Sequence, residues 1–189
     1  MGLIIGIVGF VLLFIYEVNQ ILWHKSFLKV FFTSGLLCIV TATVITVLDG
    51  WSGINAISSS FWVGVFCLTI FLVLLIYTLF FSVPFKVSYI EQFQRRRVYT
   101  QRIYALSRHP GVLWFIGVYG SLVLIFPTQS MVLLALVQIT LNLVYVIIQD
   151  VWSFPKLFVD YGQYKNKTPF LFPSIKSILI TIQSFKGRK

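Results

Sequence analysis

Acidic residues, histidine and cysteine are scarce in this chain. Of its 189 residues only five are Asp or Glu and two are His, against fifteen Lys or Arg. Two cysteines, Cys38 and Cys67, lie inside apolar runs, where cysteine usually acts as a small hydrophobic side chain. So few ligands argue against a zinc centre or a bis-histidine haem. The sequence also contains no Ser-His-Asp arrangement, phosphate-binding loop or dinucleotide-binding glycine pattern.

Apolar residues dominate instead. The chain is 58% hydrophobic and 11% charged, and its mean hydropathy of +0.92 lies outside the range of soluble domains. This composition predicts an all-α integral membrane protein that forms a single domain over residues 1–189. Runs of the length needed to cross a bilayer predict five transmembrane helices, over residues 3–22, 27–48, 61–83, 111–126 and 130–148. The first run has no basic segment before it and no small-residue cleavage site, so we expect a retained helix.

The basic residues are confined to three regions, 25–29, 86–108 and 156–189. With five spans these regions lie on one side of the membrane, and the loops 49–60 and 127–130, which contain no Lys or Arg, lie on the other. The positive-inside rule then predicts a multi-pass protein of the cell membrane with its N-terminus outside and its C-terminus in the cytosol. The net charge of +10 therefore indicates anionic lipid headgroups, not nucleic acid, as the partner.

Two segments outside the predicted spans are basic and contain aromatic or apolar residues. Residues 84–110 combine six arginine or lysine residues with Phe and Tyr, which is typical of an interfacial helix or ordered loop. The residues from Gln149 to the C-terminus form an amphipathic, basic segment, which we expect in the cytosol. The chain is thus predicted to contain five spans, one interfacial basic segment and one cytosolic C-terminal segment.

Polar residues recur along one face of the fifth predicted span. Gln138, Asn142, Tyr145 and Gln149 follow one another at spacings of four, three and four residues. Two interpretations are open, namely hydrogen bonds that join helices and the wall of a polar cavity that opens to the cytosol. Glu17 in the first span has two interpretations as well, because its carboxylate could reach the interface or line a site.

The segment Ser107–Phe115 marks the change from a basic stretch to an apolar one. Pro110 lacks an amide hydrogen and has a fixed φ, so it suits the first turn of a helix. Arg108 and His109 are therefore expected at the mouth of that helix, where unpaired backbone N–H groups favour an anion.

These residues also carry a resemblance to a known family. The segment Tyr104-Ala105-Leu106-Ser107-Arg108-His109-Pro110, the pair Gln149-Asp150 and the segment Tyr161–Pro173 resemble the isoprenylcysteine carboxyl methyltransferase family and its prokaryotic relatives. That family carries Y-x-x-S/R-R-H-P at the start of a helical hairpin, then an acidic pair, then Y-x-x-Y-x-x-x-V/T-P-x-x-x-P. The resemblance covers residues about 99–175, with pocket segments at about 99–115 and 149–175.

The resemblance implies a five-helix membrane methyltransferase that binds S-adenosylmethionine and takes a lipid-like acceptor from the bilayer, either a membrane lipid or a lipidated, for example prenylated, substrate. By position, Arg108 and His109 would hold the carboxylate end of the cofactor. The cofactor-binding residues would be Tyr104, Arg108, His109, Pro110, Gln149, Asp150, Tyr161 and Tyr164. If the acceptor is a carboxylate, it needs no deprotonation, and Arg97 or Arg102 is the candidate catalytic residue that would position it.

Two further interpretations stay open. The sterol-reductase type shares an R-H-P-like hairpin but uses NADPH, so the two enzyme classes differ in the cofactor that raises the melting temperature. The other alternative is a non-catalytic membrane protein that has the same scaffold and binds a membrane-protein partner. It rests on three departures from the family pattern. Val112 and Trp114 stand where the family commonly has an aromatic residue and a glycine, Gln149 replaces the first acidic residue, and Leu157-Phe158 replaces an aromatic-glycine pair.

Overall fold

The structure is a computed structural model that describes residues 1–53, 58–81 and 97–186. All regular secondary structure in these ranges is helical. The chain forms two compact units, of which the first comprises residues 1–70 and 116–149 and the second residues 71–115 and 150–189. The single domain predicted from the sequence stays a prediction.

Four helical stretches in the described residues are long and apolar enough to cross a membrane. They are α1 (Gly2–Val18) with η1 (Asn19–Trp23); η2 (Ser26–Lys29), α2 (Val30–Gly50) and η3 (Trp51–Gly53); α3 (Ser59–Ile76) with η4 (Tyr77–Phe81); and α7 (Gln129–Ile148), η5 (Gln149–Ser153) and α8 (Phe154–Leu157). At a rise of about 1.5 Å per residue even the shortest, of 22 residues, exceeds the hydrocarbon core of about 30 Å. These helices are compatible with a multi-pass membrane protein.

The predicted and observed elements agree in type and differ at their ends. The all-helical prediction is confirmed for the described residues, and α6 (Pro110–Ile125) begins at the proline that the sequence indicates. The loop predicted to begin at Asp49 begins later, because α2 and η3 continue to Gly53. Residues 54–57 and 82–96, and with them Arg95, Arg96 and most of the predicted interfacial segment, lie outside the described residues.

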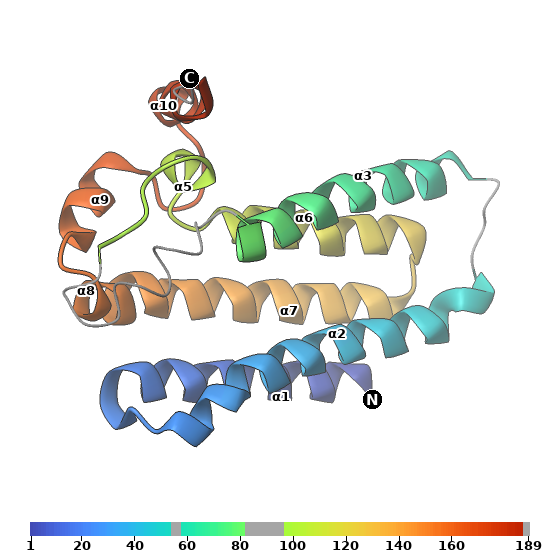
Figure 1. The fold of residues 1–189 in the computed structure, drawn as a ribbon. Helices are drawn as coiled ribbons and strands as arrows, with labels where there is room; N and C mark the ends of the chain where they lie inside the picture. The colour runs from blue at the N-terminus through green and yellow to red at the C-terminus, as the bar shows by residue number, and fades with distance from the viewer. Residues whose placement is uncertain (54–57, 82–96, 187–189) are drawn as a thin grey trace. The chain divides into compact units, whose positions relative to one another are not determined.

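In the first unit α1 and α2 form a helical hairpin (Figure 1). The two backbones approach closely at Gly9 and Gly35, since a Cβ atom on either glycine would lie 2.8 Å from the carbonyl oxygen of the other. Small residues permit such contacts between membrane helices. The turn between the helices is closed by Asn19, whose side chain accepts a hydrogen bond from Lys25 N at 2.8 Å and donates one to Lys25 O at 3.0 Å.

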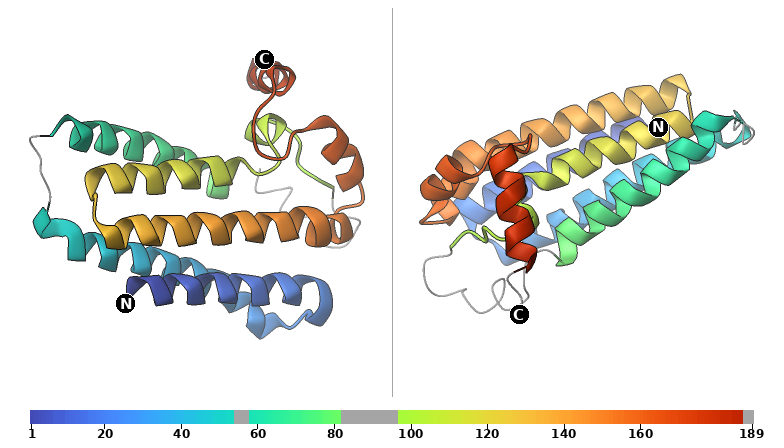
Figure 2. Two further views of the ribbon diagram at one scale, coloured as in Figure 1. Left: turned by 180° about the vertical axis from the view of Figure 1, so that it is seen from behind. Right: turned by 90° about the horizontal axis from the view of Figure 1, so that it is seen from above.

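The second unit contains α5 (Ile103–Leu106), α9 (Tyr161–Lys167) and α10 (Ile175–Lys186). Helix α10 packs against α5, and the two lie beside each other in Figure 1 and in the left view of Figure 2. Two backbone hydrogen bonds join the residues before α6 to the segment after α9, since Arg108 N–H donates to Pro169 O at 2.9 Å and His109 N–H donates to Phe170 O at 3.2 Å. These bonds hold Arg108 and His109 in place at the start of α6.

Candidate functional site: a buried ionic cluster around Asp150

The carboxylate of Asp150 is the centre of the polar interior of the second unit. Asp150 lies in η5 and is buried. Its Oδ1 atom lies 2.7 Å from Arg108 Nη1 and accepts a hydrogen bond from the Tyr161 hydroxyl at 2.5 Å. Lys165 Nζ lies 3.1 Å from Oδ2. One carboxylate thus joins the residues before α6 to two consecutive turns of α9, and we call these residues with His109 the Asp150 cluster.

Aromatic rings enclose His109 and Arg108. The imidazole of His109 is stacked on Phe154, with centroids 5.7 Å apart and an interplanar angle of 11°, and meets Phe170 edge-on at 5.2 Å. The guanidinium carbon of Arg108 lies 5.5 Å from the centroid of the Phe170 ring. His109 Nε2 is 3.4 Å from Asp150 Oδ1 without the alignment of a hydrogen bond. The cluster therefore combines cationic donors with a largely apolar wall.

Three tyrosines act as neutral hydrogen-bond donors beside the cluster, of which Tyr161 and Tyr164 are buried and Tyr104 is half-buried. Burial, together with the hydrogen bond to Asp150, raises the pKa of Tyr161 above its usual value, and burial raises the pKa of Tyr164 and of Tyr104. The phenols therefore keep their protons at neutral pH. Tyr164 donates to the carbonyl oxygen of Tyr104 at 2.7 Å and so ties α9 to α5.

The cluster has unused capacity for a polar ligand. Two buried atoms of the cluster, Arg108 Nε and His109 Nε2, have no hydrogen-bond partner among the described residues, although most buried polar atoms in proteins have one. The cations of Arg108 and Lys165 also share the single carboxylate of Asp150. This donor set suits a ligand that brings its own carboxylate and that also has a cationic or hydroxyl group for Asp150 to accept.

The structure brings together most of the residues named from the sequence. Tyr104, Arg108, His109, Asp150, Tyr161 and Tyr164 are joined by the contacts above, and Pro110 begins α6 beside them. Arg97 is exposed and Arg102 is half-buried, and neither forms an ion pair with another described residue. Arg102 has a positive φ of 55°, which costs a non-glycine residue backbone strain.

Gln149 lies in the first unit, in a second buried polar cluster. Its amide donates to Glu17 Oε2 at 3.1 Å, and the Tyr145 hydroxyl donates to the same oxygen at 2.9 Å. Glu17 is buried, and its carboxylate is paired with these two donors. At these positions the polar face of α7 forms hydrogen bonds between helices, as the first interpretation predicts. Gln138, further along that face, is fully buried and neither of its amide atoms has a partner among the described residues.

Sequence reasoning missed three contributors to the cluster, namely Phe154, Lys165 and Phe170. Lys165 follows Tyr161 by four residues, so helical spacing over residues 161–167 would have placed both on one face of α9. Phe154 and Phe170 carry no such signal, because their contacts with His109 depend on the tertiary fold.

Trp114 stands where the resembled family has a glycine, and its side chain lies against the end of the third apolar stretch. Its indole Nε1 donates to Thr78 Oγ1 at 3.0 Å, and its ring is stacked on Phe71 with centroids 6.4 Å apart. His109 has different neighbours, on α8 and on the segment after α9. The contacts of Trp114 therefore do not occupy the ring faces that surround His109.

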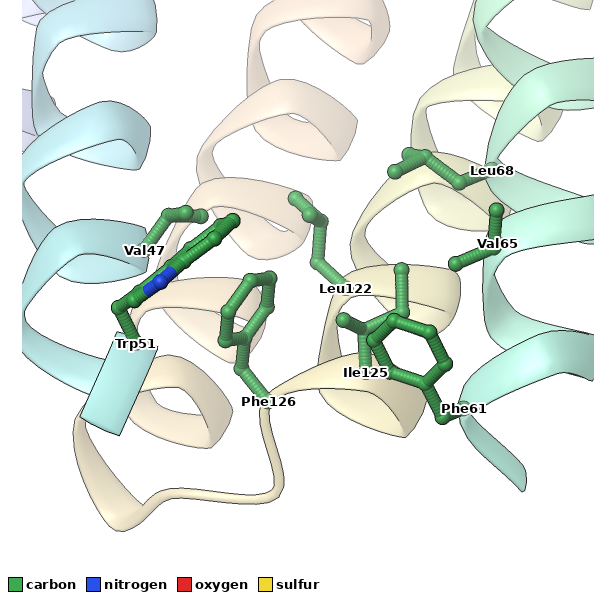
Figure 3. A pocket seen from close by; sticks show the side chains of 8 residues that line it. All are labelled: Val47, Trp51, Phe61, Val65, Leu68, Leu122, Ile125 and Phe126. Atoms are coloured by element: carbon green, nitrogen blue, oxygen red, sulfur yellow. The ribbon is translucent and has the colours of Figure 1, made fainter. Parts of the chain in front are cut away.

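An apolar cavity of about 650 Å³ lies in the first unit, at the ends of α2, α3 and α6 (Figure 3). Its lining consists of Val47, Trp51, Phe61, Val65, Leu68, Leu122, Ile125 and Phe126. No lining side chain carries a charge, so the cavity is suited to hydrocarbon and not to the polar part of a substrate.

Comparison of the chain with protein-family models, with curated proteins and with solved structures found no significant match.

Proposed function

We propose that this chain is a membrane methyltransferase of the isoprenylcysteine carboxyl methyltransferase type, which binds S-adenosylmethionine at the Asp150 cluster and methylates a lipid-like acceptor at the cytosolic membrane face. One observation carries the proposal. The segments 104–110 and 161–173 and the aspartate that follows Gln149 carry the resemblance, and they meet in one buried cluster although they lie far apart in the sequence.

The chemistry of the cluster fits the polar end of this cofactor. Arg108 and His109 would take its carboxylate, and Asp150 would accept hydrogen bonds from its ammonium or ribose hydroxyl groups. The orphaned Arg108 Nε and His109 Nε2 atoms supply donors for this purpose. The rings of Phe154 and Phe170 suit a cationic group, because the faces of aromatic rings attract cations. Gln149 as a further cofactor contact stays a prediction, since its amide is bonded to Glu17.

When bound, S-adenosylmethionine supplies a methyl group that is already activated on a sulfonium ion. The protein then has to align the acceptor and exclude water, and needs no general base if the acceptor is a carboxylate. The rings of Phe154 and Phe170 beside His109 provide an apolar wall for this purpose. Arg97, which is exposed, and Arg102 are free of ion pairs with described residues, so either can bind an acidic acceptor.

The proposal includes five spans, with α6 as the fourth, the N-terminus outside and the C-terminus in the cytosol. Helix α6 has 16 residues and is about 24 Å long, which is shorter than the hydrocarbon core. Short spans are accommodated by local thinning of the bilayer. The positions of the basic residues in the sequence support this topology, because it leaves no Lys or Arg in the outer loops.

Equilibrium binding of radiolabelled S-adenosylmethionine to the detergent-purified protein tests the proposal. We expect saturable binding that S-adenosylhomocysteine displaces and NADPH does not. His109→Ala should abolish binding without unfolding the protein, and His24→Ala, at the exposed second histidine, is the matched control that should bind normally. Displacement by NADPH would favour the reductase alternative, and unchanged binding by His109→Ala would refute the assignment of His109.

A non-catalytic scaffold is the second candidate, and one observation favours it. Asp150 is already paired with Arg108, Tyr161 and Lys165, so the cluster could act only as an internal ionic lock. Under this candidate the wild-type protein binds neither S-adenosylmethionine nor its product, while replacement of Asp150 still destabilises it.

A further inference from the structure

Helix α10 exposes a continuous apolar face. Ile175, Ile178, Leu179 and Ile182 recur at the spacing of one helical face and are 81%, 42%, 55% and 47% exposed. Phe172, just before the helix, is exposed as well. Large apolar side chains that are exposed together usually mark a surface that binds lipid or another protein.

The polar face of α10, by contrast, is turned toward the protein. Ser177 is buried, and Ser184 Oγ accepts a hydrogen bond from Arg102 N–H at 3.0 Å beside α5. Thr181 and Ser184 donate their hydroxyl hydrogens back to carbonyl oxygens of the helix itself. An amphipathic helix that docked onto a soluble core would do the reverse, because burying its apolar face is what would stabilise it. The orientation of α10 therefore requires an apolar environment outside the protein.

Charge indicates which environment this is. Residues 161–189 contain six Lys or Arg and no Asp or Glu. Lys176 is exposed and lies about 60° around the helix from Leu179, where its long side chain can reach the polar boundary of a bilayer. A second copy of the chain would bring a like-charged segment to the same face, and a lipid surface with anionic headgroups would neutralise it.

We propose that α10 lies in the plane of an anionic lipid surface, with its Ile and Leu face in the outer acyl region and its Ser and Thr face on the protein. Four helices are long and apolar enough to cross a membrane, and in a chain that they anchor there α10 would meet the bilayer at a high effective concentration. Through the bond between Ser184 and Arg102 N–H, the lipid surface also fixes the position of α5. This inference is independent of any methyltransferase activity.

A fluorescent probe on α10 tests the proposal in the full chain. Cys38 and Cys67 are replaced by Ala, a single cysteine is introduced by Leu179→Cys, and the protein is labelled with an environment-sensitive dye and reconstituted in vesicles of zwitterionic and anionic lipids. We expect blue-shifted emission and strong quenching by spin-labelled lipid. The matched control Asn166→Cys, at an exposed position on α9, should give emission typical of water and at least several-fold weaker quenching.

Three results would overturn the proposal. Emission at position 179 equal to that at 166 would mean that the apolar face is in water. Shielded emission without quenching by spin-labelled lipid would mean that a protein surface covers it. Equal quenching in purely zwitterionic vesicles would exclude the role of anionic headgroups.

A second pair of variants separates loss of docking from loss of folding. With the dye at Ile175→Cys, the further change Leu179→Glu should markedly reduce quenching by lipid, whereas Gln183→Glu adds the same charge beside the intact apolar residues and should have a smaller effect. Both variants should elute as the wild type does in size-exclusion chromatography. Equal effects of the two changes would contradict the assignment of the apolar face.

Discussion

Replacement of Asp150 by Asn is expected to destabilise the second unit strongly, because among the described residues Asp150 provides the only carboxylate in contact with Arg108 and Lys165. The shape of the side chain is kept, so the loss is electrostatic. The side chain of Arg108 is 8% exposed, and a buried charge that loses its partner typically costs about 3–5 kcal/mol. For a chain of this length such a loss lowers the melting temperature by on the order of 10 °C.

Lys165 provides the matched comparison for this prediction. Its side chain is 44% exposed, so its ion pair with Asp150 is screened by solvent and should be worth only about 0–1 kcal/mol. Thermal unfolding of detergent-purified Asp150→Asn and Lys165→Met, followed by circular dichroism, should therefore separate the two variants clearly.

A double-mutant cycle tests whether the loss of stability in Asp150→Asn arises from its pair with Arg108. If the cost arises from unpaired Arg108, Arg108→Gln combined with Asp150→Asn should be much less destabilising than the sum of the two single changes. Additive losses, or an Asp150→Asn variant as stable as Lys165→Met, would refute the reasoning that Asp150 balances a buried arginine.

Three further predictions concern the first unit. Gly9→Ala should destabilise the protein by about 1–3 kcal/mol, since the added methyl group would meet the backbone oxygen of Gly35, which cannot turn away. Gly6→Ala should cost less, because the added methyl group overlaps only the amide end of the Gln138 side chain, and Gln138→Ala should relieve that overlap. Glu17→Ala should cost about 1–3 kcal/mol, as it leaves the buried Tyr145 hydroxyl and the half-buried Gln149 amide without their acceptor. Thermal unfolding measures all three, and a Gly6→Ala loss equal to that of Gly9→Ala, or a neutral Glu17→Ala, would contradict the packing described.

Much of the fold could be predicted from hydropathy and a few local signals. Apolar runs of sufficient length locate the helices, and Pro110 marks the start of α6 because its ring permits only the first helical turn. The C-terminal end of α2 was predicted less well. Asp49 and Gly50 have turn chemistry, yet helical hydrogen bonding continues through them.

The candidate site was predictable in part. Motif spacing indicated Arg108, His109, Asp150 and Tyr161. It did not indicate that the other three side chains lie around the carboxylate of Asp150, since these contacts depend on the path of the chain through η5 and α9. The family resemblance placed Gln149 and Asp150 together, at the positions of the family's acidic pair. In the structure they separate, because adjacent residues of a helix point about 100° apart, and Gln149 bonds to Glu17 while Asp150 joins its own cluster.

The most direct test of the proposed function is the thermal stability of the detergent-purified protein with and without a large excess of S-adenosylmethionine or S-adenosylhomocysteine, with NADPH as control. A ligand that binds only the folded state at about 100 times its Kd stabilises it by about 2.7 kcal/mol. We therefore expect both sulfur compounds, and not NADPH, to raise the melting temperature by about 5–10 °C. An unchanged melting temperature with both compounds would contradict cofactor binding at the Asp150 cluster.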